Sequence, residues 1–259
     1  MKLDAFEAIP DVRALLDSFP SAGSCVRLPP LPGGASAAVA LSLADLLRDP
    51  LLVVTETPAE AERIFGDLQT FDGGPGTTYF PQRETLPYED SDPHVEISGQ
   101  RVEALRDLLA GRVSVLVSTA RALAERMPLT GDGGSIELSL NEGAEMRLSE
   151  VASRLETMGF EPVHTIQELG EFAVRGGIVD VFPYGHDFPL RIELWGDEIE
   201  SIRRFDLLTQ RSIERVDRVE ILPVTLRPQE SGAAPDFRSL LELLPPGTVA
   251  WRMAPRACR

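Results

Sequence analysis

Three side chains between residues 170 and 206 have the types that proteins use to hold another protein. Arg175 follows one apolar strand pattern, and Arg191 and Trp195 lie within another, LRIELW. Because successive strand residues point to opposite faces, Arg191, Glu193 and Trp195 share the polar face of that strand. Arginine and tryptophan are enriched among the residues that carry most of the binding energy at interfaces. The pattern therefore predicts a protein-binding anchor formed by Arg175, Arg191 and Trp195.

The same residues also fit a purely structural role. Trp195 would then cap the edge of a sheet, and both arginines would pair with nearby carboxylates such as Asp180 or Glu193. The spacing alone does not separate this interpretation from the anchor.

The dipeptide Gly196-Asp197 predicts a two-residue hairpin, and its leading glycine suits a type II′ turn. In that register Glu193 faces Glu200, an unfavourable like-charge pair unless one of the two arginines lies between them. Ile202 breaks the alternation of the second strand, which also fits a bulge in that strand.

The chain up to residue 128 alternates short apolar runs with helical patterns. Leu51–Val54 and Val113–Val117 are continuous apolar runs, typical of strands buried in a parallel sheet. Ser36 is expected to cap the helix 35–47. This alternation predicts a parallel sheet with helices packed on its faces. The other elements expected here are a strand at 78–80 and helices beginning at 57, 96 and 120.

The pattern changes near residue 128, where alternating runs replace the buried ones. The elements expected beyond it are strands near 135–140, 172–174, 177–182, 190–195 and 219–223 and helices at 150–158 and 237–244. We therefore expect an α/β domain of degenerate P-loop, helicase-like type at 1–128 and an inserted α+β domain with antiparallel strands at 129–206. Residues 207–259 are expected to return to the first domain as an incomplete segment.

Gly33-Gly34 lies where such an α/β domain would carry a phosphate-binding loop. That loop needs a lysine for the phosphates and a hydroxyl for magnesium, but residues 37–40 are Ala-Ala-Val-Ala. The paired carboxylates Glu168 and Glu171 are expected by chance in a chain with 41 acidic residues. The sequence therefore predicts no nucleotide, no cofactor and no catalytic residue, hence a chain that is not an enzyme.

The formal net charge of −16 limits the partners that the chain can take. An acidic surface repels phosphate backbones, so direct DNA binding is disfavoured. Cys25 and Cys258 lie far apart and the three histidines are scattered, so we expect no metal site and a reducing compartment. No signal-peptide pattern and no run of about 18 apolar residues is present, which favours a cytoplasmic protein.

Several motifs together indicate a family. They are the RG-x-x-x-D-x-F-P run at 175–183, the strand 190–195, Asp197-Glu198-Ile199 and Arg204-Phe205-Asp206. This segment resembles the second domain of the bacterial transcription-repair coupling factor and is similar to the matching domain of the excinuclease protein UvrB. Residues 79–109 and 115–128 resemble the coupling factor's first domain. The resemblance covers roughly residues 10–225 and thins after Pro223.

The resemblance implies a non-catalytic adaptor of nucleotide excision repair that docks the excinuclease protein UvrA. In both families the contact uses the arginine of the RG motif, the arginine of the following strand and a nearby aromatic residue. These map onto Arg175, Arg191 and Trp195. The resemblance also implies that RNA polymerase and DNA are reached through other domains of the complete protein.

Two alternatives come from other classes of protein. One is a fragment of an ATP-dependent translocase or helicase, which requires measurable affinity for nucleotide. The other is a general interaction module, for example one that contacts RNA polymerase. It would bury or salt-bridge Arg175 and Trp195 and expose a different apolar patch.

Overall fold

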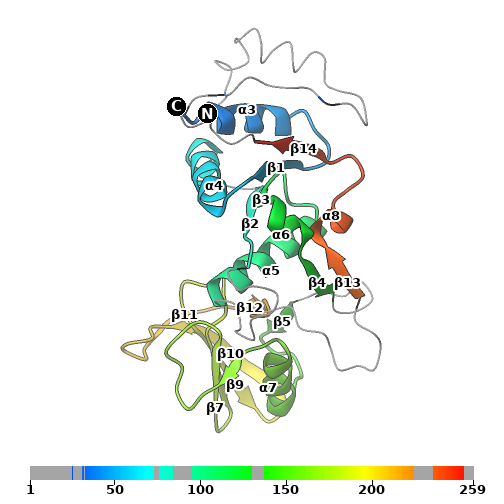
Figure 1. Cartoon of the computed structure of the whole chain (residues 1–259). Helices are drawn as coiled ribbons and strands as arrows, with labels where there is room; N and C mark the ends of the chain where they lie inside the picture. The colour runs from blue at the N-terminus through cyan, green and yellow to red at the C-terminus, as the bar shows by residue number, and fades with distance from the viewer. Residues whose placement is uncertain are drawn as a thin grey trace. The chain divides into compact units, whose positions relative to one another are not determined.

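The computed structural model describes residues 25, 31, 33–72, 76–83, 95–129, 137–224 and 236–253. The chain divides into two compact units, shown with its elements in Figure 1. Unit 1 comprises Met1–Gln82, Ala104–Arg126 and Ser239–Arg259, and unit 2 comprises Arg83–Glu103 and Met127–Arg238.

Unit 1 is built on a four-stranded sheet with the order β14-β1-β3-β2, and all its strand pairs are parallel. Apolar residues of α3, α4, β1 and β3 form its core, as the continuous apolar runs predicted. The strands are β1 (Leu51–Thr55), β2 (Thr77–Phe80), β3 (Val115–Thr119) and β14 (Val249–Arg252). The helices are α3 (Ala35–Ala44), α4 (Pro58–Asp72), α6 (Ala120–Ala124) and α8 (Leu240–Leu243), while α5 (Val95–Leu109) contributes residues to both units.

The start of α3 differs from the prediction. The N-cap position is Gly34 and not Ser36, and no side chain caps the helix. Gly33 has a φ of 55°, a conformation that suits glycine, so the chain turns into the helix before it reaches the serine. The edge strand β14 was not predicted, because it has only four residues and its partner β1 is distant in sequence.

Unit 2 is built on a six-stranded sheet with the order β11-β10-β9-β8-β7-β6, antiparallel except for the pair β6 and β7. The helix α7 (Leu148–Thr157) and the first part of α5 also belong to unit 2. Two short ladders accompany the sheet, β12 with β5 and β13 with β4, and the second has one end residue of each strand in unit 1. The strands are β4 (Arg126–Leu129), β5 (Leu138–Asn141), β6 (Glu161–Pro162), β7 (Glu171–Arg175), β8 (Ile178–Val181), β9 (Leu190–Trp195), β10 (Glu198–Phe205), β11 (Ser212–Arg215), β12 (Arg218–Ile221) and β13 (Asp236–Ser239).

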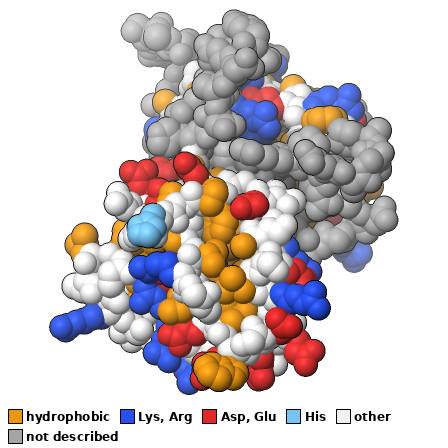
Figure 2. Space-filling view, turned by 90° about the horizontal axis from the view of Figure 1, so that it is seen from below, with side chains coloured by type: hydrophobic (Ala, Val, Ile, Leu, Met, Phe, Trp, Pro, Cys, Tyr) orange, Lys and Arg blue, Asp and Glu red, His pale blue; other side chains and the backbone are white. Residues whose placement is uncertain are grey.

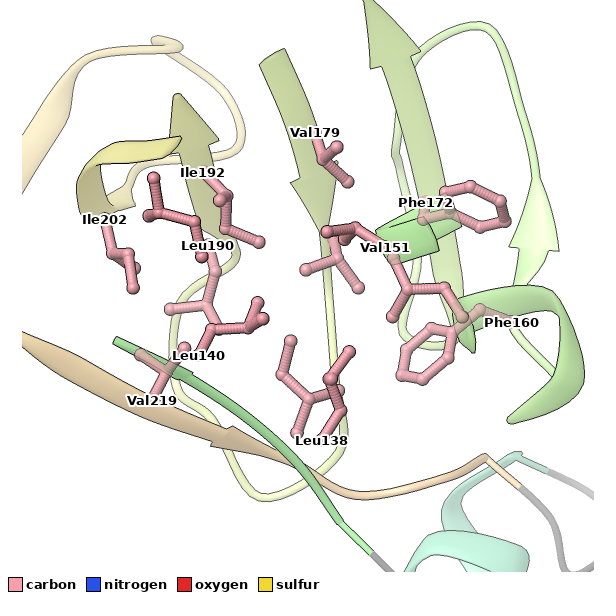
Figure 3. Close-up of a cluster of buried hydrophobic side chains, with 14 of the residues drawn as sticks. Leu138, Leu140, Val151, Phe160, Phe172, Val179, Leu190, Ile192, Ile202 and Val219 are labelled. Atoms are coloured by element: carbon pink, nitrogen blue, oxygen red, sulfur yellow. The ribbon is translucent and has the colours of Figure 1, made fainter. Parts of the chain in front are cut away.

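One face of this sheet forms the main core of unit 2. Leu190 and Ile192 of β9 point into it, and Val151 of α7 and Leu140 of β5 meet them there (Figure 3). Phe172 of β7 joins the same cluster. The alternation LRIELW thus buries its leucines and isoleucine, and leaves its polar residues and the tryptophan on the opposite face.

Residues 207–224 do not follow the path expected for a return segment. β11 pairs with β10, and β12 pairs antiparallel with β5, so both belong to unit 2. Val219 and Ile221 of β12 are buried in the core of unit 2, which explains their alternation with exposed residues. The chain re-enters unit 1 at Ser239.

The hairpin between β9 and β10 contains a bulge, and this corrects the predicted register. Trp195 pairs with Glu198 across Gly196-Asp197, and Gly196 has the positive φ of 64° expected for the turn. The register then shifts between Ile199 and Ser201, so Glu193 faces Ser201 and not Glu200. The extra residue therefore removes the like-charge pair that a regular ladder would create.

Two glycines should respond in opposite ways to alanine. A Cβ on Gly177 would lie 2.8 Å from the backbone oxygen of Leu194, whereas one on Gly66, within α4, meets no atom within 4 Å. Gly177→Ala should therefore lower the free energy of unfolding by about 1–3 kcal/mol. Gly66→Ala should raise it by about 0.5–1 kcal/mol, because a helix interior favours alanine. Urea denaturation measures the free energy of unfolding of both variants. If Gly177→Ala left that free energy unchanged, the close approach of Gly177 to the Leu194 backbone would be contradicted.

The fold class is thus a mixed α/β architecture with one parallel and one largely antiparallel sheet. The degenerate P-loop character of unit 1 stays a prediction. Among the described residues, no helix has the length and apolarity needed to cross a membrane.

Candidate docking site

The face of the six-stranded sheet opposite the main core carries the three predicted site residues. Strand register places Arg175 opposite Ile178, and Ile178 opposite Glu193. One step along the strands, Asp180 lies opposite Arg191. Trp195 ends β9 on this same face, because it follows Arg191 and Glu193 at intervals of two residues. We call this surface the docking face.

Asp180 brings the two arginines together. Its side chain is only 1% exposed, and Arg191 binds it with two donors: Nε at 2.7 Å from Oδ1 and Nη2 at 3.0 Å from Oδ2. Nη2 of Arg175 donates a further hydrogen bond to Oδ2. Both oxygens of a nearly inaccessible carboxylate are therefore occupied by guanidinium groups, a geometry that fixes the arginines as well as pairing their charge.

Arg191 is held from several sides. Its guanidinium carbon lies 4.3 Å from the centroid of the Phe205 ring, and its Nη2 donates to Oε1 of Gln210 at 3.0 Å. The hydrogen bonds to Asp180 raise the pKa of Arg191 above its ordinary value, although burial acts in the opposite direction. Arg191 thus keeps its positive charge, and its place on the face is set by Asp180, Gln210 and Phe205.

Phe205 belongs to a second, smaller core on the docking-face side of the sheet. It is fully buried with Ile166 and Ala173, and partly buried apolar residues surround the three. These surrounding residues are Val163, Phe182 and Leu207. The Arg191 side chain therefore packs against this small core through the Phe205 ring.

Trp195 has no comparable support. It is 80% exposed, an unusual state for the largest apolar side chain. It borders an open hollow lined by Gly143 and Ile199 and by four acidic residues. Those four are Glu142, Glu198, Glu200 and Asp217. Figure 2 shows a face of the molecule on which hydrophobic side chains form a band bordered by charged side chains of both signs.

The structure combines parts of the two sequence interpretations. Trp195 is exposed and does not close a sheet edge, while both arginines pair with a carboxylate, Asp180. Glu193 takes other partners: it accepts a hydrogen bond from Ser201 at 2.7 Å and pairs with Arg203 at 3.4 Å.

The sequence did not indicate Phe205 or Gln210 as parts of the site. Phe205 lay within the Arg204-Phe205-Asp206 motif, so the motif held a signal, but its pattern did not reveal contact with Arg191. Gln210 has a φ of 59°, which no feature of its sequence predicted. A non-glycine residue in this conformation commonly marks a turn fixed by its surroundings.

Other candidate sites have structural explanations or lie outside the described residues. The carboxylate of Glu171 accepts hydrogen bonds from the backbone N–H groups of Gln167 and Glu168, which is a turn-stabilising role. Among the described residues, no three His, Cys, Asp or Glu side chains are grouped so that they could hold a metal ion. Cys258 and His94 lie outside the described residues.

The docking face lies within a segment that is similar to a known domain. Residues 138–226 match the family model of the UvrB interaction domain. A transcription-repair-coupling factor of Mycobacterium bovis is 38% identical over 191 residues, which cover 71% of this chain and 15% of that protein. The factor of Myxococcus xanthus is 33% identical, covering 78% of this chain and 17% of its own length. The Escherichia coli factor is 28% identical, and the aligned residues cover 84% of this chain and 19% of that protein. The chain thus spans less than a fifth of the length of each of these relatives.

Proposed function

We propose, from the UvrB interaction domain that this chain carries and its similarity to transcription-repair-coupling factors, that it docks the excinuclease protein UvrA in nucleotide excision repair. The docking face of unit 2 is the contact surface. The aligned residues correspond to 15% of the Mycobacterium bovis relative. We assign neither RNA polymerase nor DNA to this face, and expect both to be contacted by other parts of the complete protein.

The observation that carries the proposal is the exposed indole of Trp195. Burying 150–250 Å² of an aromatic side chain contributes strongly to association, and the indole N–H can still donate to a partner. On the same face, guanidinium groups provide donors for carboxylates of the partner. Trp195 and Arg175 thus combine apolar area with charge recognition on one sheet.

The acidity of the chain adds specificity to this contact. Apart from the arginines, the neighbourhood of Trp195 is rich in carboxylates, and the net charge of the chain is −16. A partner that places acidic groups anywhere except opposite the arginines is repelled. The face therefore selects a partner with a defined arrangement of charges.

The proposal is tested by isothermal titration of the full chain into purified UvrA. Saturable binding is expected, and the corresponding domain of UvrB should compete, because both use the same contact. Absence of binding, or binding that an excess of the UvrB domain leaves unchanged, would refute the assignment of this face.

We also propose that the chain has no working nucleotide site and no enzymatic activity. Gly33 and Gly34 precede α3, but residues 37–40 offer neither the lysine nor the hydroxyl that ATP and magnesium need. Titration with ATP and magnesium should give no saturable heat. A dissociation constant in the micromolar range would favour the translocase alternative.

A further inference from the structure

We infer that the two arginines of the docking face have different tasks: Arg175 contacts the partner, whereas Arg191 and Asp180 position Arg175. This inference rests on the proposed function for its binding measurements. It is also open to a test that needs no partner.

Four of the five N–H donors of Arg191 have acceptors within unit 2. Its Nε and Nη2 bind Asp180, Nη2 also reaches Gln210 Oε1, and Nη1 lies 3.5 Å from the Gln210 backbone oxygen. One face of the guanidinium covers the Phe205 ring, and the side chain is only 16% exposed. A partner carboxylate would have to displace these contacts before it could bind Arg191 bidentately.

Arg175 is in the opposite situation. Its side chain is 43% exposed, and among the described residues its one hydrogen bond goes from Nη2 to Asp180. An arginine has five N–H donors, so Arg175 keeps donors that could bind an incoming carboxylate. The fork that can receive a carboxylate of the partner is therefore that of Arg175.

Asp180 couples the two arginines through charge. One carboxylate faces two guanidinium groups, so the group of three carries a net charge of +1, and Arg175 is its exposed end. Arg191 occupies Asp180 with two hydrogen bonds and leaves Arg175 only one. Without Arg191, Asp180 would be free to bind Arg175 bidentately and neutralise the one accessible positive charge of this group.

The first test is a double-mutant cycle on binding of purified UvrA. Arg175→Gln should weaken binding at least about tenfold, as expected for loss of a charge-assisted hydrogen bond. Arg191→Lys keeps the charge but not the bidentate geometry, and should also weaken binding. Because Arg191 acts through Arg175, the double variant should bind only slightly more weakly than Arg175→Gln alone.

The control for this cycle is Arg63→Gln, which removes a surface arginine of unit 1 that is paired with Asp67. This variant should bind UvrA as tightly as the wild type. If the losses of binding free energy of the two single variants added up in the double variant, the inference would be overturned.

The second test uses the free chain and nitrogen-detected NMR of the arginine Nε–H groups. The Arg191 Nε–H should exchange with water at least about tenfold more slowly than that of Arg175, because only the former is hydrogen-bonded and buried. Equal exchange rates would overturn the inference even if UvrA binds. If slow exchange is found but UvrA does not bind, the positioning of Arg191 stands and the proposed partner is wrong.

Discussion

Trp195→Ala should weaken binding of UvrA at least about thirtyfold, which corresponds to about 2 kcal/mol for loss of a central anchor. The free energy of unfolding should change by no more than about 0.5 kcal/mol, because the side chain is 80% exposed and no core depends on it. Titration calorimetry measures the first quantity and urea denaturation the second.

The control for this variant is Leu46→Ala, which removes an apolar side chain of unit 1 that is 58% exposed. It should leave binding unchanged within about twofold, which excludes a general effect of reduced apolar surface. Acrylamide quenching adds a direct check, because the chain has two tryptophans and Trp251 is partly buried. If Trp195→Ala bound as tightly as the wild type, or if both variants weakened binding equally, the docking face would not include the indole.

Phe205→Ala is expected to destabilise unit 2 by about 3–5 kcal/mol, the range for removing a fully buried aromatic side chain. The substitution leaves a cavity beside Ile166 and Ala173 and removes the ring over which Arg191 lies. Urea denaturation followed by circular dichroism measures the loss.

Phe205→Leu separates the two contributions of the ring. Leucine fills much of the cavity but offers no aromatic face, so the loss should fall to about 1–2 kcal/mol. If both variants lost the same free energy of unfolding, packing of the ring against Ile166 would not be its main contribution to stability. A loss below about 1 kcal/mol for the alanine variant would show that the small core is not a structural unit.

The strands and faces of unit 2 could be predicted because alternation is a local property of the chain. The pattern LRIELW placed Leu190 and Ile192 inward and Arg191 and Trp195 outward, as the structure has them. The partner of Arg191 could not be chosen from the pattern, because alternation fixes a face but not the register with the neighbouring strand. Asp180 and Glu193 therefore looked equivalent, and the register of β8 with β9 decides for Asp180.

Long-range pairings were the other part that the sequence left undetermined. The strand at 219–223 was predicted in nearly the right place, but its partner β5 lies far earlier in the chain. No local pattern distinguishes that pairing from a return to the parallel sheet. For β14 even the existence of the strand depends on β1, since four half-exposed residues form a strand only beside a partner.

The additional residue in β10 has a consequence for how chains of this type can differ in length. Ile199 and Ile202 are three positions apart, yet both point into the core, because Glu200 is left over between them. A chain that lacked Glu200 would keep every other side chain of this strand on its present side. A chain one residue shorter at Glu200 would therefore still present Trp195, which pairs with Glu198 ahead of the bulge.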